Sequence, residues 1–211
     1  MVRELHRLHN ELSERIEERL ALFRGVWERG DERELFVELA FCILTPQSNA
    51  RRCASALDCL IKSGSLFEGT LEEIRCMLNT VRFKNHKASY LIEARETFMN
   101  GRISLRRFLE ECPDTEAMRE RLVRTVKGIG LKEASHYLRN IGRGDRLAIL
   151  DRHVLRNMVR LGLIDHVPTS MTPSRYRLLE EKLRAFSDNT GIPMSHLDFL
   201  FLYRGMGDIF K

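Results

Sequence analysis

The chain has 211 residues, of which 43% are hydrophobic and 31% are charged. This composition is normal for a folded globular protein, so a disordered chain is not the default expectation. Lys and Arg outnumber Asp and Glu by 35 to 30, and the resulting charge of +5 fits a polyanionic partner without establishing one. The opening residues contain no apolar signal segment, and no stretch approaches a membrane-spanning length. We therefore expect a cytoplasmic protein without a membrane partner.

Five cysteines occur, at Cys42, Cys53, Cys59, Cys76 and Cys112, and no two of them form a CxxC pair. An odd number without compact spacing predicts neither a disulfide framework nor a zinc or iron–sulfur site. We expect these residues to be small buried hydrophobic side chains.

Helical periodicity covers nearly all of the chain, and no convincing strand pattern occurs. The predicted cap residues are Asp31, Ser48, Thr70 with Glu73, and Ser195 with Asp198. Gly30, Pro46, Gly101 and Pro113 mark expected helix ends. The sequence predicts an all-α protein of about ten short helices joined by short loops. The expected helices cover residues 2–29, 32–45, 49–64, 71–80, 85–100, 105–112, 114–126, the segment after Gly130, 151–162, 174–190 and 195–206.

The segment TVKGIGLKEASHYLRNIG stops a helical run at Gly128-Ile129-Gly130 and restarts it at once. Glycines without a Cβ allow a tight turn and a close approach to another backbone. The N–H groups and dipole of the restarted helix suit a phosphate oxygen. The pattern predicts a helix–hairpin–helix motif that binds the DNA backbone, although an ordinary tight turn is the alternative. Its backbone carbonyls, with Arg124, Val126 and Ile129 as candidates, could hold a structural monovalent cation.

Lys132 stands in the first turn of the restarted helix, where the dipole disfavours its ammonium form. Partial burial acts in the same direction, so this position suits an amine nucleophile. Asp151 follows the apolar run LAIL and is predicted to cap the next helix. If the chain brings its carboxylate beside the amine, it could accept the proton of Lys132 and stabilise positive charge on a sugar. A phosphate-binding lysine and a plain N-cap are the alternatives.

VKGIGLKEASHYLRN followed by AILDRHVL resembles the helix–hairpin–helix DNA glycosylase superfamily, and most closely the archaeal-type (type 2) 8-oxoguanine DNA glycosylase/AP lyases. The resemblance spans most of the chain and is strongest over residues 121–160. It implies one two-lobed all-α glycosylase domain over 1–211 with the active site in the cleft between the lobes. Lobe one would be about 33–144, with the hairpin at 121–140, and lobe two about 1–32 plus 145–211.

The resemblance also implies a bifunctional DNA glycosylase and AP lyase of base-excision repair. Such an enzyme flips 8-oxoguanine out of double-stranded DNA. Lys132 would attack C1′ and form a Schiff base, Asp151 would assist, and β-elimination would cut the strand. The resemblance implies a monomer that associates with the nucleoid and requires no cofactor and no iron–sulfur cluster.

Other assignments carried by the resemblance concern the duplex gap and the lesion pocket. Capping is the competing explanation for Asn49, and core packing competes for Phe83. The implied gap-filling or opposite-strand residues are Gln47, Asn49 and Arg51, and the implied pocket residues are Phe83, Leu202 and the C-terminal Lys211.

Two features depart from the family pattern. Leu202 occupies a position in the last helix where relatives often have tryptophan, and TPQSNARRC is closer to the endonuclease III branch. That branch normally has a C-terminal four-cysteine cluster, which is absent here. A glycosylase for another damaged base, such as an oxidised pyrimidine, therefore remains an alternative, as does a non-catalytic helix–hairpin–helix DNA-binding module.

Overall fold

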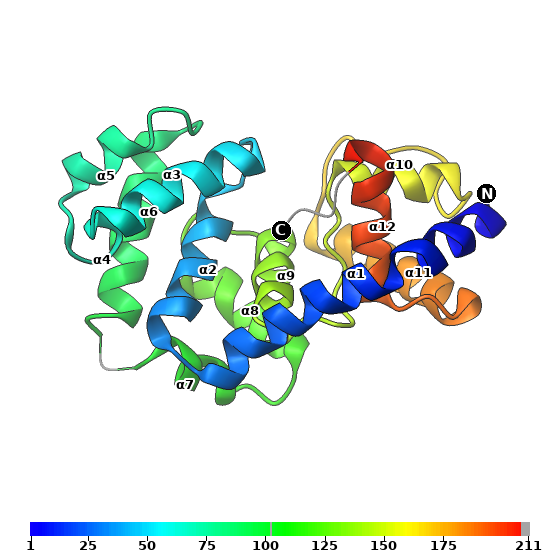
Figure 1. The fold of residues 1–211 in the computed structure, drawn as a ribbon, viewed down its shortest axis with the longest axis horizontal. Helices are drawn as coiled ribbons and strands as arrows, with labels where there is room; N and C mark the ends of the chain where they lie inside the picture. The colour runs from blue at the N-terminus through cyan, green and yellow to red at the C-terminus, as the bar shows by residue number, and fades with distance from the viewer. Residues whose placement is uncertain (102, 208–211) are drawn as a thin grey trace. The chain divides into compact units, whose positions relative to one another are not determined.

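A computed structural model describes residues 1–101 and 103–207 of the chain, and the backbone alone of Met206. The predicted site residue Lys211 lies outside this part. The described residues are helical with no strand, so the all-α prediction is confirmed (Figure 1). The helices are α1 (Val2–Arg29), α2 (Glu32–Leu44), α3 (Ala50–Lys62), α4 (Ser65–Glu68), α5 (Leu71–Met77), α6 (Lys84–Phe98), α7 (Leu105–Glu110), α8 (Thr115–Thr125), α9 (Leu131–Asn140), α10 (Arg152–Arg160), α11 (Pro173–Thr190) and α12 (Met194–Met206).

The chain divides into two compact units. Unit 1 comprises Met1–Gly25 and Leu138–Lys211, and unit 2 is the continuous segment Val26–Tyr137. The predicted lobes had their boundaries a few residues later, at 32/33 and 144/145. The hairpin and Lys132 belong to unit 2, whereas Asp151 belongs to unit 1.

Unit 2 is built around α2, whose sequence ERELFVELAFCIL is apolar on nearly every side after the first turn. A helix of this kind is stable only when it is enclosed, and Phe36 and Phe41 are at most 1% exposed. α2 packs against α3, α6 and α7. The end of α2 therefore lies in the core of the unit, and the loop that follows it reaches the surface at Gln47.

In unit 1, α12 packs against α10 and α11, and one stripe of α1 is buried. The rings of Phe23 and Phe199 stack with centroids 6.4 Å apart. The Arg139 guanidinium lies 4.6 Å from the Phe199 ring centroid and 3.2 Å from a carboxylate oxygen of Asp198. A cation between two aromatic faces and a carboxylate ties the end of α9 to α12.

Several helix ends follow the sequence signals. Asp31 caps α2, and Thr70 with Glu73 forms the predicted capping box of α5. Two predicted caps are wrong. Asn49, and not Ser48, caps α3, because the Ser48 hydroxyl accepts hydrogen bonds from the distant residues of α6 and its entry.

The second wrong cap is Ser195. α12 begins one residue earlier, at Met194, after Pro193. Asp198 instead forms the ion pair with Arg139. The four-residue helix α4 was not predicted, since a single turn leaves too little periodicity to detect.

The segment before Asp151 has no regular secondary structure, and α11 supplies hydrogen-bond partners for its backbone. The buried Tyr176 hydroxyl donates to the Ala148 carbonyl at 2.6 Å and accepts from the Leu150 N–H at 3.4 Å. Glu180 accepts from the Ala148 N–H at 2.8 Å. These bonds satisfy backbone groups that no helix or strand pairs, and they fix the segment that leads to Asp151.

Tyr176→Phe should therefore lower the free energy of unfolding by about 1–2 kcal/mol, because a buried carbonyl and a buried N–H lose their partner. Thermal unfolding followed by circular dichroism should show a lower Tm. Tyr90→Phe is the matched control, since no hydrogen-bond partner of that hydroxyl occurs among the described residues. Equal Tm values for the two variants would contradict this account.

Candidate active site

The hairpin is a sharp reversal between α8 and α9. Val126 ends α8 in an extended conformation with φ −97° and ψ 117°. Gly128 then adopts the left-handed region with φ +85°, and α9 begins at Leu131. Val126, Ile129 and Leu131 are all at most 9% exposed. The apolar residues of the motif thus anchor the turn to the unit 2 core.

The two glycines of the motif have different reasons to be glycine. A Cβ on Gly128 would lie 2.4 Å from the Tyr90 ring, and its positive φ also disfavours other residues. A Cβ on Gly130 would meet only Glu133 Oε2, at an ordinary 3.5 Å. The fold requires Gly128, whereas it would tolerate a side chain at Gly130.

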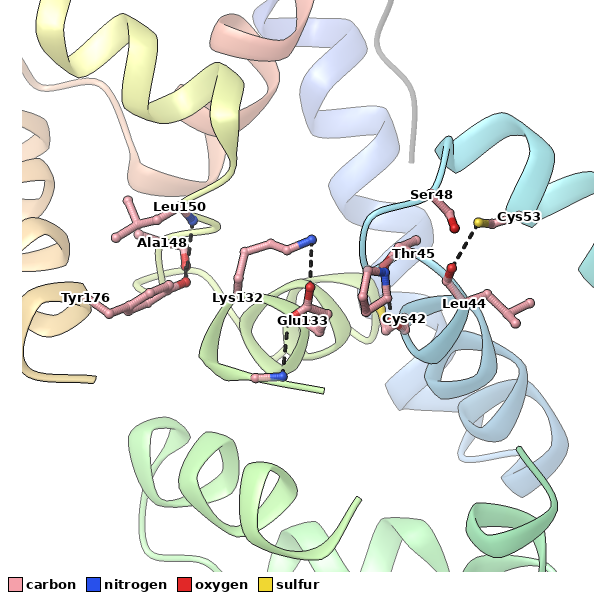
Figure 2. A network of polar contacts seen from close by, with 12 residues as sticks. Cys42, Leu44, Thr45, Ser48, Cys53, Lys132, Glu133, Ala148, Leu150 and Tyr176 are labelled. Atoms are coloured by element: carbon pink, nitrogen blue, oxygen red, sulfur yellow. Dashed lines mark hydrogen bonds and ion pairs between the residues drawn. The ribbon is translucent and has the colours of Figure 1, made fainter. Parts of the chain in front are cut away.

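Glu133 contacts both the start of α9 and the candidate nucleophile. Its Oε2 accepts from the Gly130 N–H at 3.1 Å, and its Oε1 lies 3.0 Å from Lys132 Nζ (Figure 2). The carboxylate is nearly buried, with 13% of the side chain exposed, and the Lys132 side chain is 28% exposed. Sequence reasoning missed Glu133, although an acidic residue three positions after Gly130 is half of a capping-box signal.

Asp151 has the predicted capping role. Its Oδ1 accepts from the N–H groups of His153 and Val154 at 2.7 and 2.8 Å, which fixes the start of α10. Oδ2 is not used by this cap. The side chain is half-buried, so the carboxylate is both held in place and accessible.

Two other candidate residues have a strained backbone conformation. Gln47 and Phe83 are the non-glycine residues with positive φ in the described part, at 53° and 58°. A left-handed conformation costs such a residue about 1–3 kcal/mol and is typical of functional sites. Phe83 is 50% exposed, so core packing does not explain it. Strain at an exposed aromatic and an exposed amide favours a binding role for both.

Lys87 links the two strained loops. It was not predicted as a site residue. Its side chain is buried, and Nζ donates to the carbonyls of Leu44 and Pro46, both at 2.7 Å, and to Ser48 Oγ at 2.9 Å. Ser48 Oγ also accepts from the Arg82 N–H at 3.1 Å. Burial lowers the pKa of Lys87 below its ordinary value, an effect partly offset by the nearby charges of Cys53 and Glu133.

The remaining candidates lie at the start of α3 and on α12. Asn49 is exposed and accepts from the Arg52 N–H at 3.1 Å as the cap of α3, and Arg51 is exposed in the first turn of that helix. Leu202 is half-buried on α12 in unit 1, next to the fully buried Phe201.

The cysteines are reduced, but the prediction that all are buried is wrong. Cys42 and Cys53 are buried, whereas Cys59 and Cys76 are exposed on α3 and α5. Burial raises the pKa of the Cys53 thiol, which donates to the Leu44 carbonyl at 3.1 Å. Within residues 1–101 and 103–207, no three His, Cys, Asp or Glu side chains form a metal-binding group. In the same residues, no helix is long and apolar enough to cross a membrane.

Known proteins resemble this chain over most of its length. The family model described as 8-oxoguanine DNA glycosylase matches residues 16–192. The 8-oxoguanine DNA glycosylase/AP lyase of Fusobacterium nucleatum is 44% identical over 209 residues, which is 99% of this chain and 96% of that protein.

Two solved structures are similar over the whole chain. The 8-oxoguanine DNA glycosylase of Thermotoga maritima has a TM-score of 0.87 at 35% identity and is covered to 98%. The Methanocaldococcus jannaschii 8-oxoguanine glycosylase/lyase, solved with a 15mer DNA containing 8-oxoguanine, has a TM-score of 0.90 at 30% identity and is covered to 99%. With its hairpin and its fold shared over this length, the chain belongs to the 8-oxoguanine DNA glycosylase family.

Proposed function

We propose that this chain excises 8-oxoguanine from double-stranded DNA through a Schiff base on Lys132 and then cuts the strand by β-elimination. The observation that carries the proposal is an amine in the first turn of α9, 3.0 Å from a carboxylate, in a chain of this family. Its relatives are glycosylases and AP lyases, so this chain is an enzyme of base-excision repair.

The proposed reaction begins when the neutral Nζ of Lys132 attacks C1′ of the damaged nucleotide. The C1′–N9 bond breaks, and the departing base takes up a proton. Ring opening of the sugar leaves a Schiff base between Nζ and C1′. Loss of a C2′ proton then expels the 3′ phosphate oxygen, which cuts the strand, and water releases the lysine.

The carboxylates of Glu133 and Asp151 have different roles in this scheme. Glu133 holds the Lys132 ammonium before DNA binds and also fixes the hairpin at Gly130. Asp151 accepts the proton that the Lys132 ammonium loses before attack and passes it to the departing base, so that it is again a carboxylate as positive charge develops on the sugar. Its cap uses only Oδ1, which leaves Oδ2 for this purpose.

The hairpin binds the DNA backbone next to the lesion in this proposal. N–H groups at the start of α9 meet a phosphate, and the absent side chain at Gly130 lets the strand approach. The neutral carbonyl oxygens of Arg124, Val126 and Ile129 are hard ligands that suit a monovalent cation. The extended Val126 and left-handed Gly128 turn the backbone out of the helix there, which fits such a site.

Phe83 and Leu202 are the proposed faces of the lesion pocket, together with Lys211. Gln47 fills the gap left by the extruded base, with Asn49 beside it and Arg51 toward the opposite strand. The enzyme is proposed to act as a monomer on nucleoid DNA and to need no cofactor. The exposed, strained conformations of Gln47 and Phe83 support these roles.

Lys132→Gln should abolish base excision and strand cleavage, because an amide cannot form a Schiff base. Single-turnover assays on a duplex with one 8-oxoguanine measure both steps. Lys127→Gln is the matched control from the same hairpin, since Lys127 is exposed and pairs with Glu93 at 2.9 Å. Excision by Lys132→Gln at the wild-type rate would refute the proposed nucleophile.

Asp151→Asn should separate capping from catalysis, because asparagine caps a helix as well as aspartate does. We expect an unchanged Tm and DNA affinity, with excision slowed by about 10²–10⁴-fold through loss of the general base. Binding by fluorescence anisotropy and single-turnover rates test this. If Asp151→Asn excised normally while Asp151→Ala lost stability, Asp151 would be a cap alone.

Gly130→Ala should leave Tm unchanged and weaken binding to undamaged duplex by about tenfold, the equivalent of one lost hydrogen bond to a charged group. The reason is that the fold tolerates a Cβ here, whereas the proposed close contact between a phosphate and the start of α9 would not. Gly128→Ala is the contrasting variant and should lose Tm. Fluorescence anisotropy titrations at several salt concentrations measure this binding. If Gly130→Ala bound DNA like the wild type, the proposed role of the hairpin in DNA binding would be contradicted.

A further inference from the structure

Unit 2 contains a buried ammonium that the reaction itself does not use. Lys87 lies in the first turn of α6, and its ammonium donates to two carbonyls and one hydroxyl at the end of α2 and in the loop that follows it. Its side chain is 3% exposed. A lysine so enclosed loses hydration and is retained only where its hydrogen bonds replace the lost water.

All the acceptors belong to one short segment. Leu44 is the last residue of α2, Pro46 precedes the strained Gln47, and Ser48 follows it. The Leu44 carbonyl also accepts from the Cys53 thiol at 3.1 Å. Lys87 therefore holds the residues directly before and after Gln47, which limits the φ and ψ that this exposed residue can adopt.

The second strained residue lies at the start of the same helix. Phe83 is the residue before α6, and its carbonyl accepts from the Lys87 N–H at 3.0 Å. The Ser48 hydroxyl, already bonded to Lys87 Nζ, accepts from the Arg82 N–H at 3.1 Å. One side chain thus joins the segment that carries Gln47 to the turn that carries Phe83.

We propose that Lys87 is a positioning residue for base extrusion, holding Gln47 and Phe83 in the left-handed conformations from which they meet the DNA. The inference rests on the proposed function, in which Gln47 fills the gap and Phe83 contacts the extruded base. Lys87 touches neither DNA nor base. It acts through a preorganised pair of loops, because Ser48 links its ammonium to the turn before Phe83 and a strained backbone persists only where its surroundings hold it.

The test is Lys87→Met, which keeps an unbranched side chain of similar length and removes all three donors. Lys62→Met, at the exposed end of α3 in the same unit, is the matched control. Two single-turnover reactions are compared, namely excision of 8-oxoguanine opposite cytosine and cleavage at a preformed abasic site. A duplex with 2-aminopurine beside the lesion reports extrusion by its fluorescence rise.

Lys87→Met should slow excision by about tenfold to hundredfold, as a misplaced contact group does, and reduce the fluorescence rise. Cleavage at the abasic site should change by less than about twofold, because its damaged base is already gone and Lys132 is intact. Equal loss of both reactions would overturn the proposal, since it would show a merely structural role. Excision and fluorescence like those of Lys62→Met would also overturn it.

Ser48→Ala serves if Lys87→Met fails to fold, because it removes one acceptor and leaves the lysine in place. It should slow excision by about threefold or more, in line with one lost hydrogen bond, with the abasic reaction again preserved. A wild-type enzyme that excises no 8-oxoguanine would contradict the proposed function instead. The fluorescence rise would still test Lys87 in that case, because it does not require excision.

Discussion

The carboxylate of Glu133 sets the geometry on which the candidate active site depends. One oxygen receives the Gly130 N–H and so fixes the point where the hairpin becomes α9, while the other lies against the Lys132 amine. This single side chain therefore fixes the spacing between the proposed phosphate contact at Gly130 and the nucleophile Lys132, two residues later. Because the Glu133 side chain is largely buried, water does not compete strongly for either contact.

A second constraint acts on the loops that carry Gln47 and Phe83. Left-handed backbone at exposed residues is retained only where the surroundings over-determine it, and the buried Lys87 ammonium supplies that restraint. In the hairpin and in the strained loops alike, a buried charged side chain binds backbone groups and so holds exposed groups in place. Tyr176 and Glu180 also hold backbone groups, in the segment before Asp151.

The features that the sequence predicts well are local. Asp31, the Thr70 box and the hairpin each depend on residues a few positions apart, and the structure places them as expected. Lys132 and Asp151 could be nominated because chemistry and motif agree there. Ser48 and Lys87 could not, because their partners lie about forty positions away and no local pattern links them. Asp198 was misassigned for the same reason, since Arg139 is a distant partner.

The central claim is that Lys132 forms the covalent bond to DNA. It is tested most directly by borohydride reduction during the reaction with 8-oxoguanine duplex, followed by digestion and mass spectrometry of the adduct. The account predicts the reduced sugar on Lys132 and on no other amine. An adduct on Lys127, Lys87 or the N-terminal amine, or no adduct despite strand cleavage, would contradict it.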